Sequence, residues 1–201
     1  MPSYKVSYFD MKGRGELARL VLAAAGQKFE DNRLAKGDWG TMKPGTPYGQ
    51  LPVLEVDGKM LGQSGAMVRY VARQHGLMGS GAWEEALIDS FNDAAMDVFQ
   101  AAMKVIYGTE ESQKAAEGKK FKDETVPGFF KIFDKYIQEH GKDGHVVGNK
   151  LSLADLALFN VVDQLITIQL TGADCAEQFP NVKKVVDTVK HDPKIDAYLK
   201  K

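Results

Sequence analysis

The first third of the chain carries two alternating kinds of hydrophobic pattern. Tyr4, Val6 and Tyr8 recur at every second position, which predicts a short strand. Residues 17–24 then place apolar side chains at helical spacing, and Gly26 follows as a helix stop. This opening therefore predicts a strand followed by a helix.

The next segment predicts a second strand, a long loop and a hairpin. Residues 28–33 have the composition of a strand, and residues 37–49 are rich in Gly and Pro, which favours a loop around at most one short helix. Two short apolar runs, 53–56 and 59–61, flank Asp57-Gly58, a dipeptide that favours a two-residue turn. We therefore expect the two flanking strands to be antiparallel.

A further helix completes this region. Ser64 is a suitable N-cap, the helix is expected to run to Gln74, and Gly76 supplies the stop. The predicted element order is βαβαββα, the order of a thioredoxin-like domain over residues 1–78.

Beyond a linker of small residues, the patterns are helical. Apolar stripes at helical spacing run through residues 87–102 and 121–137. Ser152 and Asp155 form a capping box before a strongly apolar segment, and Pro180 and Pro193 mark two more helix starts. The predicted fold class is α/β plus all-α, with an all-helical C-terminal domain over residues 82–201.

Composition narrows the function classes. The chain has 201 residues, is 44% hydrophobic, and carries a formal net charge of −1 without a long basic run, so neither nucleic acid nor membrane insertion is expected. With a single cysteine, Cys175, no intrachain disulfide can form, and the N-terminus lacks a signal-peptide core. The expected location is the cytoplasm, and the expected partners are small molecules.

Tyr8 is the most informative candidate for chemistry. The turn after such a strand is where a thioredoxin-type fold holds its reactive group, and here Gly13-Arg14-Gly15 follows Tyr8 with no Cys-x-x-Cys. A phenol at this place can donate a hydrogen bond to a sulfur atom from outside. Ser7 is a competing hydroxyl, but strand alternation points it to the opposite face.

These features together resemble the cytosolic glutathione S-transferases of the sigma class, the group that includes haematopoietic prostaglandin D synthases. The resemblance covers essentially the whole chain. The residues that carry it are Tyr8, Arg14, Trp39, Lys43, Gln50, Leu51, Pro52, Gln63, Ser64, Asp97 and the Ser152-x-x-Asp155 box.

The resemblance implies glutathione as substrate, with Tyr8 and Arg14 as the catalytic residues that stabilise its thiolate. It places Gln63 and Ser64 at the γ-glutamyl carboxylate, where a helix N-terminus favours an anion. It implies a cis Pro52 that turns the Leu51 backbone toward the cysteinyl part of glutathione.

The glycyl carboxylate is expected to meet Trp39, Lys43 and Gln50. The resemblance also implies a homodimer in which Asp97 reaches the glutathione ammonium of the other subunit. Read without the resemblance, Asp97 belongs to an acidic helix stripe with Asp89 and Asp93, which either attracts cations or is simply solvated.

Two departures bear on the reaction. Metal-stimulated prostaglandin D synthases of this class carry an acidic residue where this chain has Met96, and a tryptophan where it has Lys104. The expected function is therefore conjugation of glutathione to hydrophobic electrophiles, with no metal. The alternatives are prostaglandin isomerisation or peroxide reduction with the same thiolate, and a non-catalytic role as a carrier of hydrophobic ligands such as haem or as a crystallin-like structural protein.

The second substrate is expected to occupy an apolar pocket. Its candidate lining residues are Phe9, Met103 and Tyr107, taken from weakly specified apolar positions.

Overall fold

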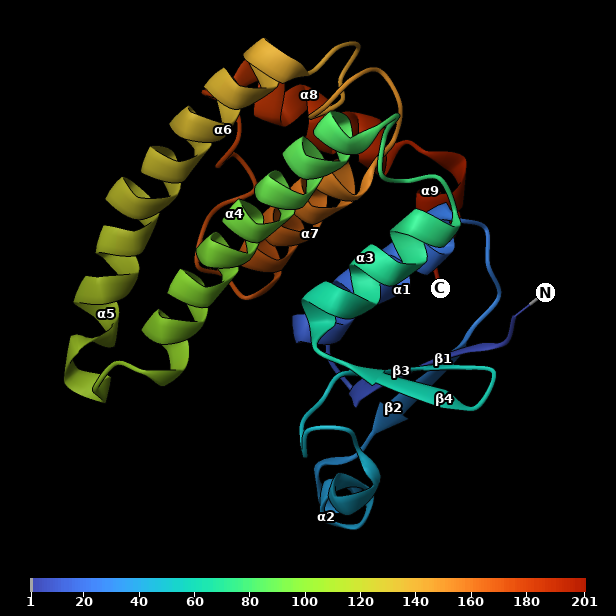
Figure 1. Ribbon diagram of the computed structural model, residues 1–201. Helices are drawn as coiled ribbons and strands as arrows, with labels where there is room; N and C mark the ends of the chain where they lie inside the picture. Colours follow the sequence, from blue (N-terminus) through green and yellow to red (C-terminus); the bar gives the residue numbers. More distant parts are fainter. Residues whose placement is uncertain (1) are drawn as a thin grey trace. The chain divides into compact units, whose positions relative to one another are not determined.

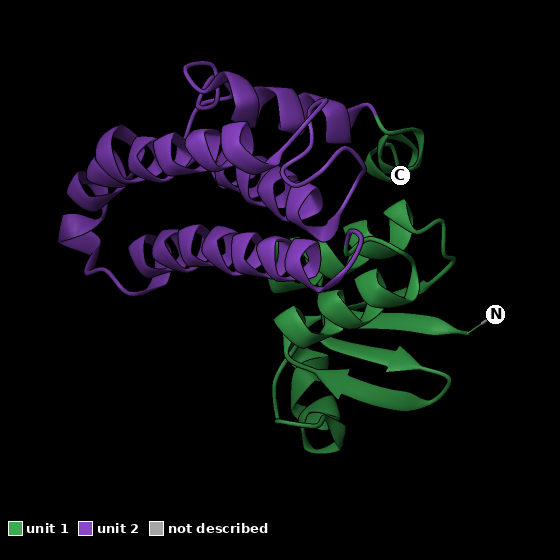
Figure 2. Ribbon diagram, turned by 45° about the horizontal axis from the view of Figure 1, so that its top comes forward, with its two compact units in different colours: residues 1–78, 192–201 green, residues 79–191 purple. Residues whose placement is uncertain are grey.

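The computed structural model describes residues 2–201 and divides the chain into two compact units (Figure 2). The first unit comprises the chain up to Met78 together with Asp192–Lys201, and the second comprises Gly79–His191. The sequence prediction assigned residues 192–201 to the helical domain, whereas the structure groups them with the first unit.

The first unit is built on a four-stranded sheet with the order β2-β1-β3-β4 (Figure 1). β1 is parallel to β2 and antiparallel to β3, and β3 is antiparallel to β4. The predicted thioredoxin-like arrangement is therefore confirmed. The bounds are β1 Tyr4–Phe9, β2 Glu30–Leu34, β3 Val53–Val56 and β4 Lys59–Gly62.

Two helices, α1 (Glu16–Ala24) and α3 (Ser64–Gln74), lie side by side against the same face of this sheet (Figure 1). The predicted hairpin turn is present, because Asp57 and Gly58 both have positive φ. The loop before β3 contains the short helix α2 (Trp39–Met42) between two 3₁₀ turns, η2 (Lys36–Asp38) and η3 (Lys43–Gly45).

The prediction that Ser64 caps α3 was wrong by one residue. Ser64 is the first helical residue, and Gln63 is the N-cap, with φ of 68° and no side-chain capping bond. A helix start has several free backbone N–H groups, so the cap and the first helical residue are hard to separate by residue type alone.

The second unit consists of helices, as predicted. α4 contacts α7, which in turn contacts α8, and α8 also contacts α6. The predicted capping box is present at the start of α7: the Asp155 carboxylate accepts from the Ser152 N–H at 2.7 Å and from the Ser152 hydroxyl at 2.8 Å. The bounds are α4 Ala82–Tyr107, α5 Glu111–Lys120, α6 Val126–His140, α7 Leu153–Thr167 and α8 Pro180–Lys190.

The apolar stripe over residues 121–137 does not form a uniform α-helix. Its first part, Phe121–Thr125, is a π-helical turn (η4), after which α6 begins at Val126. The two prolines mark helix starts as predicted, at α8 and at α9 (Pro193–Leu199). Within residues 2–201 no helix has both the length and the apolar character that a membrane crossing requires.

Candidate functional site

A cavity of about 550 Å³ opens in the first unit beside the C-terminal end of β1. Its size lies within the range of small-molecule sites. The lining residues are Tyr8, Phe9, Arg14, Trp39, Gly49, Gln50, Leu51, Pro52, Gln63 and Ser64.

Tyr8 lines this cavity, and the backbone of two glycines packs directly against its side chain. A Cβ atom on Gly13 would fall 2.8 Å from the Tyr8 hydroxyl oxygen, and one on Gly15 would fall 2.8 Å from Tyr8 Cβ and Cγ. Cβ atoms in proteins essentially never approach other atoms this closely, so a side chain at either position would force the turn or the ring to move. The Gly13-Arg14-Gly15 turn (η1) therefore needs both glycines to let the backbone lie flat against the phenol.

Arg14 is carried by the same turn. It is solvent-exposed and lines the cavity that Tyr8 also lines. Because the glycines on either side fix the turn against the Tyr8 ring, the guanidinium and the phenol are held by one piece of backbone.

Ser7 occupies the opposite face of β1, as the strand alternation predicts. Its buried hydroxyl accepts a hydrogen bond from the Asn32 side chain of β2 at 3.0 Å. It does not line the Tyr8 cavity. Tyr4, by contrast, shares the Tyr8 face, and its hydroxyl pairs with His75 Nε2 at 3.0 Å.

An aromatic row runs from Tyr8 across the cavity wall. Phe9 meets Tyr8 edge-on at 5.6 Å between ring centroids, and Trp39 meets Phe9 edge-on at 6.3 Å. Phe9 was predicted only for the second-substrate pocket, yet it lines the same cavity as Tyr8. The half-buried Trp39 is thereby attached to the strand that carries Tyr8.

The backbone on the other side of the cavity comes from the start of β3 and of α3. The Leu51–Pro52 peptide bond is cis. Gln63 Nε2 lies 3.5 Å from Gln50 Oε1, so these two side chains adjoin. Gln63 holds a positive φ of 68° that only glycine adopts readily, and such backbone outliers gather at ligand sites.

Lys43 and Gly49 lie next to each other at this cavity. Lys43 is exposed on η3 and is not among the lining residues, but its stem passes Gly49, where an added Cβ would lie 3.6 Å from Lys43 Cε. Gly49 lines the cavity and was missed at the sequence level. Gly49 has a positive φ of 60°, which explains the need for glycine there. In the sequence, a loop with several glycines does not show which of them has this conformation.

The remaining candidates lie on α4 of the second unit. Asp97 is exposed, Met103 is half-buried, and Tyr107 has 76% of its surface exposed. Cys175 is also in this unit, and burial raises the pKa of its thiol. A thiol with a raised pKa is a poor nucleophile at neutral pH. Among residues 2–201, no three His, Cys, Asp or Glu side chains group as a metal site would need.

Comparison with known proteins covers both halves of the chain. Residues 4–73 match the family described as "Glutathione S-transferase, N-terminal domain", and residues 96–201 match "Glutathione S-transferase, C-terminal domain". "Probable glutathione S-transferase 7" of Caenorhabditis elegans is 40% identical over 99% of this chain and 96% of its own length.

Two relatives carry a different name. "Hematopoietic prostaglandin D synthase" of Gallus gallus is 35% identical over 100% of this chain and 97% of its own length. The solved "Structure of prostaglandin synthase D of Nilaparvata lugens" superimposes with a TM-score of 0.89 and 36% identity, covering 99% of this chain and 98% of that one. With both of its halves matched, the chain belongs to the glutathione S-transferase family, whose substrate is glutathione.

Proposed function

We propose that the Tyr8 cavity binds glutathione and that the Tyr8 hydroxyl donates a hydrogen bond to the glutathione sulfur. The observation that carries this proposal is the convergence of Tyr8, Arg14, Gln63 and Ser64 on one cavity. Glutathione brings a thiol, two carboxylates and peptide edges, so its site needs a sulfur donor, N–H groups and an exposed backbone edge.

The energetics favour a hydroxyl donor. A free thiol has a pKa of about 8.5, so only about 3% is thiolate at neutral pH, and lowering that pKa by about two units requires about 2.7 kcal/mol. One hydrogen bond to a charged acceptor contributes about 1.5–3 kcal/mol. The Tyr8 phenol supplies most of this stabilisation, and Arg14 supplies the remainder electrostatically. The thiolate then attacks an electrophilic carbon, and the bond to the leaving group breaks.

The other parts of glutathione meet the remaining lining residues. The γ-glutamyl carboxylate lies at the N-terminus of α3, where Ser64 and Gln63 present free N–H groups and the positive end of the helix dipole. The cysteinyl backbone pairs with the chain at Leu51, next to Pro52. The glycyl carboxylate contacts the Trp39 indole, Lys43 and Gln50.

We also propose a sigma-class homodimer that acts on hydrophobic electrophiles in the cytoplasm, in a detoxifying role. Arg69 and Arg73 stand one turn apart on α3, and Asp93 and Asp97 stand one turn apart on α4. A two-fold axis that brings these helices together pairs opposite charges. In that dimer Asp97 contacts the glutathione ammonium of the partner subunit, while Phe9, Met103 and Tyr107 line the pocket for the electrophile.

Prostaglandin isomerisation is the second candidate function. It is favoured by the likeness to the Gallus gallus and Nilaparvata lugens relatives named above. Met96 and Lys104 stand where metal-stimulated prostaglandin D synthases carry an acidic residue and a tryptophan, and this argues for conjugation instead.

Tyr8→Phe tests the main proposal. The variant is expected to bind glutathione with nearly unchanged affinity, because the carboxylate and backbone contacts remain. It loses the thiolate absorbance near neutral pH, and its kcat at pH 6.5 falls about 10- to 150-fold, the equivalent of about 1.5–3 kcal/mol. Activity returns in part as the pH rises, because free thiolate then forms without help.

Tyr4→Phe is the matched control. It removes a hydroxyl from the same face of β1, but one that pairs with His75 and does not line the cavity. Its thiolate signal and kcat are expected to match the parent enzyme. If Tyr8→Phe keeps both the thiolate signal and kcat at pH 6.5, Tyr8 is not the catalytic hydroxyl and Arg14 becomes the leading candidate.

A further inference from the structure

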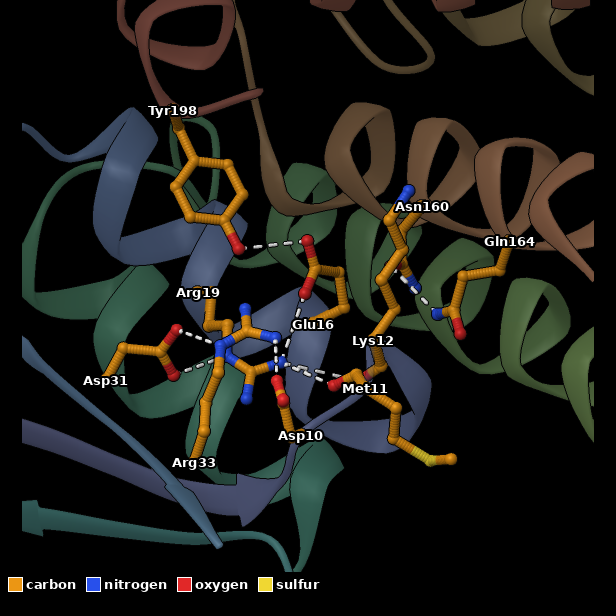
Figure 3. Close-up of polar contacts among 10 residues, drawn as sticks. All are labelled: Asp10, Met11, Lys12, Glu16, Arg19, Asp31, Arg33, Asn160, Gln164 and Tyr198. Atoms are coloured by element: carbon orange, nitrogen blue, oxygen red, sulfur yellow. Dashed lines mark hydrogen bonds and ion pairs between the residues drawn. The ribbon is translucent and has the colours of Figure 1, made fainter. Parts of the chain in front are cut away.

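A network of charged and polar side chains links Glu16, Arg19, Asp31 and Tyr198 (Figure 3). Glu16 directly follows the Gly13-Arg14-Gly15 turn in the chain. Glu16 and Arg19, on the first turns of α1, have only 3% and 0% of their surfaces exposed. One Glu16 oxygen accepts from Arg19 Nη1 at 3.1 Å, and the other accepts from the Tyr198 hydroxyl at 2.9 Å. Buried charges are tolerated only when they are paired and hydrogen-bonded, so each partner holds the next in place.

Arg19 connects this network to the loop that enters the turn. Its Nη1 also donates to the Met11 carbonyl at 2.9 Å and lies 3.5 Å from the Lys12 carbonyl, and its Nε donates to Asp31 of β2 at 2.7 Å. The backbone immediately before Gly13 is therefore fixed by a side chain whose own position depends on Glu16 and Asp31.

Tyr198 enters the network from the far end of the chain. It lies on α9, which packs against α1 within the first unit. Burial first, and then the neighbouring Glu16 carboxylate, raise the pKa of the Tyr198 phenol well above its usual value. The phenol therefore remains a hydrogen-bond donor to Glu16 throughout the neutral and mildly alkaline range.

We infer that Tyr198 is a positioning residue for thiolate formation, acting through Glu16 and Arg19 on the turn that packs against Tyr8 and carries Arg14. This inference rests on the proposed function, in which Tyr8 and Arg14 act on the glutathione sulfur. The coupling is mechanical: because Gly13 and Gly15 touch the Tyr8 ring, a small displacement of the turn moves the phenol and the guanidinium together.

The same helix offers a control at its other end. Lys194 Nζ donates to the Ala24 carbonyl at 2.9 Å, at the C-terminus of α1 and away from the turn. Tyr198 and Lys194 thus both dock α9 onto α1 by one hydrogen bond, but only Tyr198 reaches the end of α1 that adjoins Gly15. Loss of either bond weakens the docking, and only loss of the first disturbs the turn.

The experiment compares Tyr198→Phe with Lys194→Met in the full-length enzyme, each assayed well below its own midpoint of thermal unfolding. We expect kcat of Tyr198→Phe at pH 6.5 to fall about threefold to fivefold, the size expected for a misplacement of a few tenths of an ångström. The apparent pKa of bound glutathione should rise by about half a unit, which by itself lowers the thiolate fraction about twofold at pH 6.5, and the displaced Arg14 accounts for the rest of the loss. KM for glutathione should change by less than about twofold, because the carboxylate contacts lie elsewhere in the cavity.

Lys194→Met should lower the unfolding midpoint while leaving the pH profile in place. If it shifts the profile as much as Tyr198→Phe does, or if Tyr198→Phe lowers the midpoint without moving the profile, Tyr198 only docks α9 and the inference is overturned.

A double variant separates this inference from the proposed function. With Tyr8→Phe already present, Tyr198→Phe should shift the pKa of bound glutathione by little further, because its main route of action is gone. Should Tyr8→Phe alone leave the thiolate intact, the proposed function fails. Should Tyr8→Phe remove the thiolate while Tyr198→Phe shifts nothing, only the positioning role fails.

Discussion

The cavity residues of the first unit and the candidate residues on α4 of the second unit differ in what fixes their side chains. Around Tyr8, the side chains are positioned by an unusual backbone conformation. Gly13 and Gly49 have positive φ, and so does Gln63, which is the N-cap of α3. On α4, Asp97, Met103 and Tyr107 stand on a regular helix and are exposed or half-buried.

The consequence is a different tolerance to substitution. A helix surface accepts almost any side chain, whereas a backbone position with positive φ strains most residues other than glycine, and a close backbone contact leaves no room for a side chain. Glutathione, the shared substrate, is expected to be bound where the backbone is constrained. The electrophile is expected to be selected on α4, where residues exchange freely. This division predicts opposite outcomes for substitutions in the two regions.

Asp155→Ala is expected to have the largest effect on folding. The carboxylate is fully buried and accepts from the Val146 and Ser152 N–H groups and from the Ser152 hydroxyl. Its loss leaves three donors without an acceptor, which costs about 3–5 kcal/mol in the free energy of unfolding. Urea unfolding measures this cost, and Asp187→Ala on the exposed face of α8 is the control, expected to stay within about 0.5 kcal/mol. A small loss at Asp155 would mean that water or another group takes over the three donors.

Asp97→Ala tests whether α4 contributes to glutathione binding at all. If the carboxylate contacts the ammonium of glutathione, its removal costs about 1.5–3 kcal/mol, or about 10- to 150-fold in KM for glutathione. Light scattering should show an unchanged mass. Met103→Ala is the companion variant, expected to alter only KM for the electrophile. An unaltered KM for glutathione in Asp97→Ala would assign the carboxylate to a solvated helix face.

Gly15→Ala tests whether the backbone of the first unit positions the Tyr8 side chain. The added methyl group would lie 2.8 Å from Tyr8 Cβ and Cγ, so the turn or the ring must move, at a cost of about 1–3 kcal/mol. kcat should fall with it, because the phenol and Arg14 are displaced together. Gly118→Ala on α5 is the control: nothing lies within 4 Å of its added Cβ, and a helical alanine gains about 0.5–1 kcal/mol. Equal effects from the two alanines would remove the distinction between the regions.

Local patterns explain why much of the fold was predictable. The alternation of Tyr4, Val6 and Tyr8, the Asp57-Gly58 turn and the Ser152–Asp155 capping box each act within a few residues, and each is present in the structure. The membership of α9 was not predictable in this way. Its docking depends on Tyr198 meeting Glu16 across most of the chain, and no local pattern encodes that contact.

The candidate site likewise contains residues that could be predicted from the sequence and residues that could not. Residues such as Gln50, Pro52 and Ser64 were found through a family resemblance, and they line one cavity with Tyr8. The role of the two glycines as a surface for the Tyr8 ring was missed, because a glycine in sequence indicates a turn and not what the turn touches. Glu16 and Arg19 were missed as well, since a charged pair three residues apart on a helix is usually solvated.

The smallest predicted effect tests whether the C-terminal segment belongs energetically to the first unit. The Tyr198 pKa is raised in the folded state by burial and by Glu16, so above pH about 10 the unfolded chain loses this proton while the folded chain keeps it. The stabilisation is therefore complete below pH about 10 and is lost as the pH rises beyond it, by up to about 1.4 kcal/mol per pH unit. Urea unfolding at about pH 9, 10 and 11 should show a steeper decline for the parent enzyme than for Tyr198→Phe. Tyr4, whose pKa burial also raises, is present in both proteins and cancels in the difference. Parallel declines would show that Tyr198 is as solvated in the folded chain as in the unfolded one, and that α9 contributes nothing to the first unit through this hydroxyl.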